Sequence, residues 1–196
     1  MTSTPLRSVT VIGCGPTGTS IALALTRAGV DVALADSDPR ALDRALMAGA
    51  GTLLIPGDRP ADVVVVATGP DTAADVLYEA QARGLGRAYT DLHGTEESMG
   101  QEIWLRGCDQ FAYVPGRPPA APHTAEHGAA SADRFEGRPW LLVPGPATPP
   151  EAVAAVRELV ALCGAIRHQP PAAGPSRSVT FCARQVAAPS APHQRS

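Results

Sequence analysis

Three glycines and an aspartate near the N-terminus have the types and spacing of a dinucleotide-binding site. Gly13, Gly15 and Gly18 form a Gly-x-Gly-x-x-Gly pattern, and Asp36 follows at about the 20-residue distance typical of such sites. The first glycine would permit a tight turn, the second would let the main chain approach a pyrophosphate, and the third would let a helix pack closely on a strand. The aspartate would accept hydrogen bonds from ribose hydroxyls and repel a 2′-phosphate. We therefore predict that NAD, in preference to NADP, is bound by Gly13, Gly15, Pro16, Thr17, Gly18 and Asp36.

The residues around this pattern predict the elements that would position it. The apolar run 9–12 is typical of a buried strand, and Ile21, Leu25 and Ala28 recur at helical spacing. A second strand at 30–35 ends immediately before Asp36. The start of the intervening helix would present N–H groups and the positive end of its dipole to the phosphates. Arg40 is the one nearby feature that would suit NADP instead.

The rest of the chain alternates between strand and helix patterns. This alternation predicts an α/β fold, a Rossmann-type, doubly wound, mainly parallel sheet. Further strands are expected at 52–55, 62–67, 88–90, 111–114 and 165–167, and helices from Pro39 and over 71–83, 96–106 and 151–162. The segment 115–139 is rich in Pro, Gly and Ala, and it is too long for a simple connector.

Two loops follow predicted strands and should lie beside the same ligand. Thr68 and Gly69 follow the strand at 62–67, and Asp91 follows the strand at 88–90. Ligands of open α/β sheets bind outside the carboxyl ends of the strands. We therefore expect Thr68, Gly69 and Asp91 to flank the nicotinamide end of the cofactor.

The composition of the chain argues against several kinds of partner and against a metal site. The chain has 196 residues, 44% of them apolar, and a net charge of −3, which argues against nucleic acid and anionic membranes as partners. Its four cysteines lack disulfide or metal-ligand spacing, so we expect reduced thiols, a cytoplasmic location and no metal site. Residues 1–168 are interpreted as one nucleotide-binding domain. Residues 169–196 lack acidic residues and helical periodicity and are predicted to be a disordered tail.

Further motifs resemble the prephenate and arogenate dehydrogenase family. The segments 113–118 (YVPGRP), 126–130 (EHGAA) and 135–144 (FEGRPWLLVP) are similar to that family's Gly-His-Pro, Glu-x-Ser-Gly and Phe-x-x-x-x-Trp-x-Leu-x-Pro motifs. Residues 90–94 (TDLHG) resemble its Thr-Asp-Val-Gly-Ser. The resemblance extends over about residues 8–167, which corresponds to the family's nucleotide-binding domain.

The resemblance implies NAD-dependent oxidative decarboxylation of prephenate or a related cyclohexadienyl acid, in tyrosine or secondary aromatic biosynthesis. The family's catalytic histidine falls on Arg117, which remains protonated and cannot act as a base but could bind a substrate carboxylate. The family's serine falls on Gly94, with Thr95 beside it as a substrate-binding candidate. His93 and His123 are the candidate substitute bases.

The resemblance also leaves alternatives open. The family continues into a helical domain that forms the dimer, and residues 169–196 show no such pattern. A homodimer or a partner chain could supply the missing domain, and a frame shift near Ile166 is one hypothesis for its loss. The chain could then be a catalytically impaired or truncated NAD-binding protein. A third interpretation is a flavin- or NADPH-binding module, because residues 13–18 and 67–69 also resemble motifs of such proteins.

Overall fold

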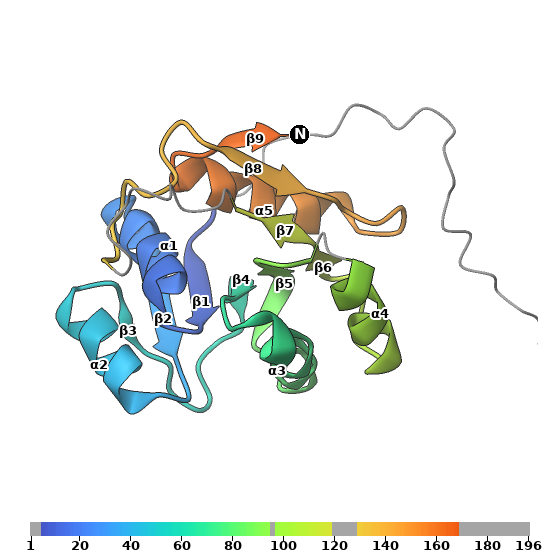
Figure 1. Ribbon diagram of the computed structural model, residues 1–196, viewed down its shortest axis with the longest axis horizontal. Coiled ribbons are helices and arrows are strands. Elements are labelled where there is room, and N and C mark those ends of the chain that lie inside the picture. The colour runs from blue at the N-terminus through green and yellow to red at the C-terminus, as the bar shows by residue number, and fades with distance from the viewer. Residues whose placement is uncertain (1–4, 95–96, 119–128, 169–196) are drawn as a thin grey trace, which may run out of the picture.

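A six-stranded parallel sheet forms the centre of the protein (Figure 1). The computed structural model describes residues 5–94, 97–118 and 129–168. Within them the strand order is β3-β2-β1-β4-β5-β6, so the predicted Rossmann-type sheet is confirmed. The strands are β1 (Ser8–Ile12), β2 (Asp31–Ala35), β3 (Thr52–Leu53), β4 (Ala61–Val66), β5 (Gly86–Asp91) and β6 (Tyr113–Val114).

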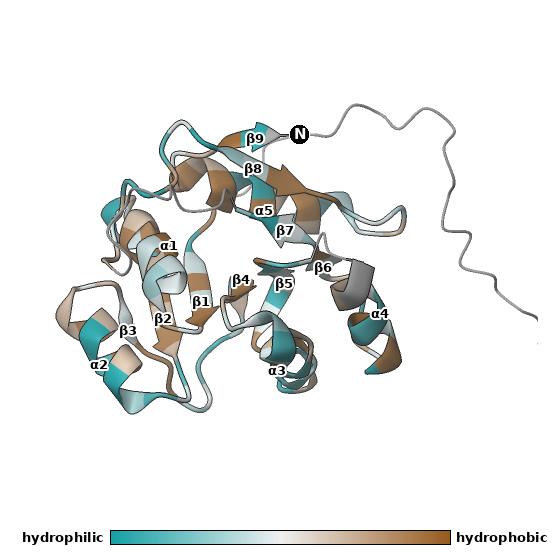
Figure 2. Ribbon diagram, viewed as in Figure 1, coloured by the Kyte–Doolittle hydropathy of each residue, from teal (hydrophilic) through white to brown (hydrophobic). Residues whose placement is uncertain are grey.

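Helices cover both faces of this sheet. The helices are α1 (Pro16–Arg27), α2 (Pro39–Met47), α3 (Pro70–Ala82), α4 (Glu97–Leu105) and α5 (Pro150–Leu162). Helices α1, α2 and α5 bury side chains in one core, and α3 and α4 in the other. Strand β4 serves both cores, because Val63 and Val65 point into the first and Val64 and Val66 into the second. In Figure 2, β1 and β4 are drawn largely in brown, the colour of hydrophobic residues.

Proline starts four of these helices. Pro16, Pro39, Pro70 and Pro150 stand at the first helical positions, where the missing N–H is not needed and the fixed φ suits the helix. Only in α2, among these four, does a side chain cap the helix: Asp38 accepts a hydrogen bond from the Arg40 N–H at 2.9 Å. The helices that follow β1 and β4 therefore begin with no capping side chain.

A second, three-stranded sheet lies against α5 (Figure 1). Strand β7 (Gly116–Arg117) runs antiparallel to β8 (Pro139–Leu142), and β8 runs parallel to β9 (Ile166–His168). The fully buried rings of Phe135 and Trp140 join this sheet to the first core, with centroids 5.1 Å apart. The sequence analysis did not predict β7 or β8. These strands are too short to show alternation, and distant residues pair them.

Two predicted strands are shorter than expected. The strand expected at 52–55 ends at Leu53, because the Ile55 N–H donates to Asp58 Oδ2 at 2.9 Å instead of to a strand. The strand expected at 111–114 begins at Tyr113, because the Phe111 N–H donates to Asp109 Oδ1 at 2.8 Å. Both are local turns in which an aspartate competes with the sheet. The tail predicted at 169–196 lies outside the described residues.

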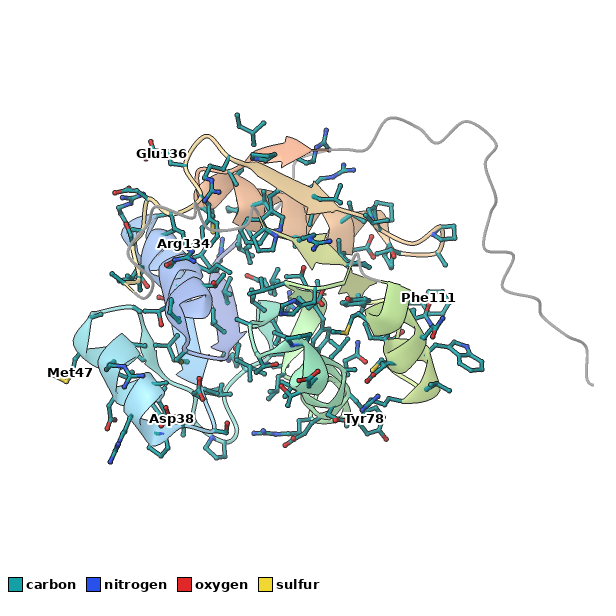
Figure 3. The ribbon with its side chains drawn as sticks, in the orientation of Figure 1. Asp38, Met47, Tyr78, Phe111, Arg134 and Glu136 are labelled. Atoms are coloured by element: carbon teal, nitrogen blue, oxygen red, sulfur yellow. The ribbon has the colours of Figure 1, made fainter. Side chains whose placement is uncertain are left out.

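We predict that Phe135→Ala lowers the free energy of unfolding by about 3–5 kcal/mol, because it empties a buried ring site. The matched control is Phe111→Ala, whose ring is 62% exposed and points outward near α4 (Figure 3). We expect that substitution to change stability by less than about 0.5 kcal/mol. Urea unfolding followed by circular dichroism measures both. Equal unfolding midpoints in the two variants would contradict the assignment of Phe135 to the core.

Candidate cofactor site at the carboxyl edge of the sheet

The carboxyl ends of β1 and β4 lie at a point where the connections of the sheet reverse direction, and we call the region between these two strand ends the cofactor crevice. The two strands are neighbours, but α1, which follows β1, packs in one core and α3, which follows β4, packs in the other. Such a point of reversal is where open α/β sheets bind ligands. Two hydrogen bonds extend the sheet into the loops here: Gly13 N–H to Ala35 O at 2.8 Å, and Ala67 N–H to Ile12 O at 2.7 Å.

Two glycines are required by packing, and one leaves space. Gly13 has φ +107°, and a Cβ there would lie 2.6 Å from the carbonyl carbon of Ala67. A Cβ on Gly18 would lie 2.0 Å from the Gly13 oxygen. Gly15, in contrast, has φ −66°, and a Cβ there would meet no atom within 4 Å. Gly13 and Gly18 therefore bring β1, α1 and β4 together, while Gly15 presents open main chain.

The N-terminus of α1 fits an anion. Gly15 is the N-cap and provides no side chain, and the first helical hydrogen bond is donated by the Thr19 N–H to Gly15 O at 2.9 Å. A helix leaves the earlier N–H groups, here those of Thr17 and Gly18, without intrahelical acceptors, and its dipole favours negative charge there. The Thr19 hydroxyl also donates to Cys14 O at 2.9 Å and holds the loop in place. The arrangement suits a pyrophosphate.

Asp36 lies at the end of β2 with its carboxylate directed at this loop. Its Oδ2 accepts a hydrogen bond from the Cys14 N–H at 2.5 Å, and its Oδ1 accepts one from the Asp38 N–H at 2.7 Å. Each oxygen retains a second lone pair that could accept from a ribose hydroxyl. Asp36 therefore also fixes the glycine-rich loop, a contact that the sequence did not predict. Burial, with Asp36 nearby, raises the pKa of the Cys14 thiol to about 11, so this cysteine stays neutral.

Asp91, the last residue of β5, is only 1% exposed. Its Oδ1 accepts hydrogen bonds from the Tyr113 hydroxyl at 2.9 Å and the Gly116 N–H at 3.3 Å, and its Oδ2 accepts one from the His93 N–H at 3.0 Å. Burial raises the pKa of the Asp91 carboxyl, and these three donors oppose that rise. The carboxyl predicted beside the cofactor is thus enclosed by protein, and its contacts organise the loops around the crevice.

His93 connects the two loops that follow β4 and β5. Its Nε2 lies 3.2 Å from Thr68 O. A carbonyl oxygen can only accept, so this contact assigns the proton of a neutral imidazole to Nε2 and leaves Nδ1 as an acceptor. The imidazole is half-buried. Thr68 and His93, both predicted site residues, are therefore in contact, and Nδ1 is the atom of this pair that can take a proton.

The remaining predicted site residues are less closely grouped. Gly69 is the N-cap of α3 and, like Gly15, has open space where a Cβ would be. Arg117 lies on β7 and is exposed. Thr95 and His123 lie outside the described residues. Gly116 precedes Arg117 and was missed by the sequence analysis as a contact of Asp91, because no local pattern reveals a partner 25 residues away.

An open cavity of about 530 Å³ lies at the β6 edge of the sheet. Gly94, Tyr113 and Pro115 line one part, and Ile103, Phe111 and Val143 are among its apolar walls. None of the predicted site residues that the structure describes lines it, so this cavity is separate from the cofactor crevice. Among the described residues, no group of His, Cys, Asp and Glu is arranged to hold a metal ion. The described helices also include none with the length and apolar character needed to cross a bilayer.

Sequence comparisons relate the chain to known proteins. The family model described as "Prephenate dehydrogenase, nucleotide-binding domain" matches residues 21–168. The probable prephenate dehydrogenase NovF of Streptomyces niveus is 42% identical over 161 residues, which are 82% of this chain and 44% of that protein. The chain thus spans less than half the length of this curated relative.

Solved structures show the same fold. Prephenate dehydrogenase from A. aeolicus, solved with hydroxyphenyl propionate and NAD+, has a TM-score of 0.71 at 19% identity, covering 86% of this chain and 61% of that one. Synechocystis arogenate dehydrogenase has a TM-score of 0.69 at 18% identity, covering 83% and 59%. At these identities the structures support the fold alone.

We predict opposite effects of alanine at two glycines of the loop. Gly18→Ala should lower the free energy of unfolding by more than about 2 kcal/mol, because its Cβ would overlap the Gly13 oxygen. Gly15→Ala should leave stability within about 0.5 kcal/mol of the wild type but weaken dinucleotide binding at least about tenfold, because the methyl group occupies the approach to the helix N-terminus.

Thermal unfolding and calorimetric titration with NAD separate the two effects. Unimpaired NAD binding by Gly15→Ala would contradict the placement of the pyrophosphate, and full stability of Gly18→Ala would contradict the close helix packing.

Proposed function

Because the chain belongs to the family of prephenate dehydrogenase nucleotide-binding domains, we propose that it is an NAD-dependent oxidoreductase of that type. The proposed reaction is oxidative decarboxylation of prephenate or a related cyclohexadienyl acid. The observation that carries the proposal is the cofactor crevice: an uncapped helix N-terminus at an open glycine, with Asp36 directed at the same loop.

The residues of the crevice fit NAD in a definite orientation. The pyrophosphate would bind the N–H groups at the start of α1, and the adenosine ribose would bind the Asp36 carboxylate. The nicotinamide would then lie toward Thr68 and Gly69 at the start of α3 and toward His93. Asp36 disfavours a 2′-phosphate by charge repulsion, which supports NAD over NADP.

His93 supplies the proton acceptor in this proposal. NAD, when bound, would supply the hydride acceptor for the ring carbon that bears the 4-hydroxyl. His93 Nδ1 takes the hydroxyl proton, the bond to the ring carboxylate breaks, and its electron pair makes the ring aromatic as CO2 leaves. The phenolic oxygen then recovers a proton. His93 is suited to this role because Thr68 O fixes its ring and assigns the acceptor to Nδ1.

Arg117 is the proposed carboxylate ligand. It occupies the position of the histidine in the family's Gly-His-Pro motif and is exposed on β7, which follows directly from the carboxyl end of β6. A guanidinium group can bind a carboxylate through two parallel hydrogen bonds. Thr95, next to Gly94, remains a proposed substrate-binding residue.

A second candidate function is NAD binding without turnover. One observation favours it: Arg117 stands where the family motif has its histidine. A homodimer or a partner chain that completes the substrate site would reconcile this observation with catalysis. We also propose that the enzyme is cytoplasmic and has neither a membrane nor a nucleic acid as a partner.

The direct test adds NAD and prephenate to the purified protein and follows absorbance at 340 nm, with NAD binding measured in parallel. We expect turnover, and we expect His93→Gln to reduce it at least about 100-fold while NAD binding changes by less than about twofold. Turnover unaffected by His93→Gln would contradict its role as the base. NAD binding with no turnover in the wild type would support the second candidate.

A neighbouring pair of acids tests cofactor choice. Asp36→Asn should reduce the preference for NAD over NADP at least about tenfold, because the charge that repels a 2′-phosphate is removed. Asp38→Asn is the matched control, since asparagine can still accept the Arg40 N–H as the N-cap of α2. We expect this control to keep the wild-type preference in titrations with both cofactors. An unchanged preference in Asp36→Asn would show that Asp36 does not discriminate.

A further inference from the structure

The contact between Tyr113 and Asp91 occupies the space beside Gly94. A Cβ on Gly94 would lie 2.3 Å from Asp91 Oδ1, 2.3 Å from the Tyr113 hydroxyl and 2.9 Å from Pro115 Cα. Tyr113 is itself only 5% exposed, and its hydroxyl donates to Asp91 Oδ1 at 2.9 Å. The hydrogen bond therefore fills the place that a side chain at position 94 would need.

One carboxylate thereby joins the segments that follow two strands. Asp91 accepts from the His93 main chain after β5 and from the Gly116 main chain after β6. The His93 imidazole in turn reaches Thr68 O, in the loop that follows β4. The orientation of the Asp91 carboxylate consequently determines where the His93 main chain lies, and with it the imidazole.

We propose that Tyr113 is a positioning residue whose hydroxyl, acting through Asp91, holds His93 against Thr68. This series of contacts, from Tyr113 through Asp91 to His93, depends on the Tyr113 hydroxyl and not on its ring alone. The catalytic consequence rests on the proposed function, in which His93 takes the substrate proton.

The proposal explains why His93 and Gly94 occur together. Residues 90–94 resemble the Thr-Asp-Val-Gly-Ser motif of the family. That motif ends in glycine and serine, whereas this protein has histidine and glycine at positions 93 and 94. With the Tyr113 hydroxyl on Asp91, a serine at position 94 would overlap both groups. In this loop the polar side chain therefore stands at position 93. Tyr113 and Asp91 occupy the space that a side chain at position 94 would need.

Removal of the hydroxyl should act on Asp91 first. Tyr113→Phe keeps the ring in the core but leaves Asp91 Oδ1 with the Gly116 N–H, at 3.3 Å. The Tyr113 donor lowers the pKa of Asp91 against the effect of burial, so its loss shifts that pKa further upward. A carboxyl that protonates or rotates no longer holds the His93 N–H in the same place.

Tyr89 provides a matched control on the adjacent strand. It is 3% exposed, its hydroxyl accepts from the Gly86 N–H at 3.0 Å and donates to Ala80 O at 3.4 Å, and it pairs in register with Tyr113. Its hydroxyl lies at the amino end of β5, away from Asp91 at the carboxyl end. Tyr89→Phe therefore also removes one buried hydroxyl, with no contact to His93.

The experiment compares the ring-nitrogen NMR signals of His93 in the wild type, Tyr113→Phe and Tyr89→Phe at mildly alkaline pH. His93→Gln identifies the signals. We expect Tyr113→Phe to shift the His93 ring-nitrogen signals toward those of a histidine in free exchange with solvent, and Tyr89→Phe to leave them unchanged. In the turnover assay, Tyr113→Phe should lower kcat at least about tenfold with KM for NAD within about twofold, and Tyr89→Phe should leave both within about twofold.

Two results would overturn the proposal: unchanged His93 signals in Tyr113→Phe, or the same change in both variants, which would reflect general destabilisation. The NMR comparison requires neither NAD nor turnover. A wild type without NAD binding or activity would therefore refute the proposed function and leave the test of Tyr113 intact.

Discussion

The close approach of α1 to β1 and β4 is the constraint on which the rest of the structure depends. Gly18 lies so near the Gly13 oxygen that no side chain fits between them, and a Cβ on Gly13 would likewise overlap the main chain of Ala67. This packing brings the start of α1 to the reversal point of the sheet and leaves open space where a Cβ of Gly15 would be. Asp36 completes the arrangement, because it accepts a hydrogen bond from the Cys14 N–H within the same loop. The packing of the fold and the proposed cofactor site thus depend on the same few residues.

The two halves of the crevice are built differently. On the side of β1 and β2, the start of α1 provides main-chain N–H groups with no capping side chain. The half-exposed carboxylate of Asp36 accepts a hydrogen bond from the glycine-rich loop that precedes this helix. On the side of β4, β5 and β6, a buried carboxylate, Asp91, gathers donors from Tyr113, His93 and Gly116. The first half is suited to binding phosphates and ribose. The second half is suited to holding a reactive side chain at a fixed place, which is what proton transfer requires.

Much of the fold could be predicted, because its signals are local. The buried run of valines in β4, the glycine spacing and the prolines at helix starts each indicate an element within a few residues. The second sheet could not be predicted, because Gly116 pairs with Leu142 across a long connection. For the same reason the enclosure of Asp91 by Tyr113 was missed. The family match also removes the need for the flavin-module interpretation that the glycine motif alone permitted.

A crystal structure of the protein grown with NAD would show where each part of the cofactor binds. We expect the pyrophosphate against the Thr17 and Gly18 N–H groups, the adenosine ribose on Asp36 and the nicotinamide between Thr68 and His93. NAD bound elsewhere, or bound with its ribose away from Asp36, would show that the crevice does not bind the cofactor in this way.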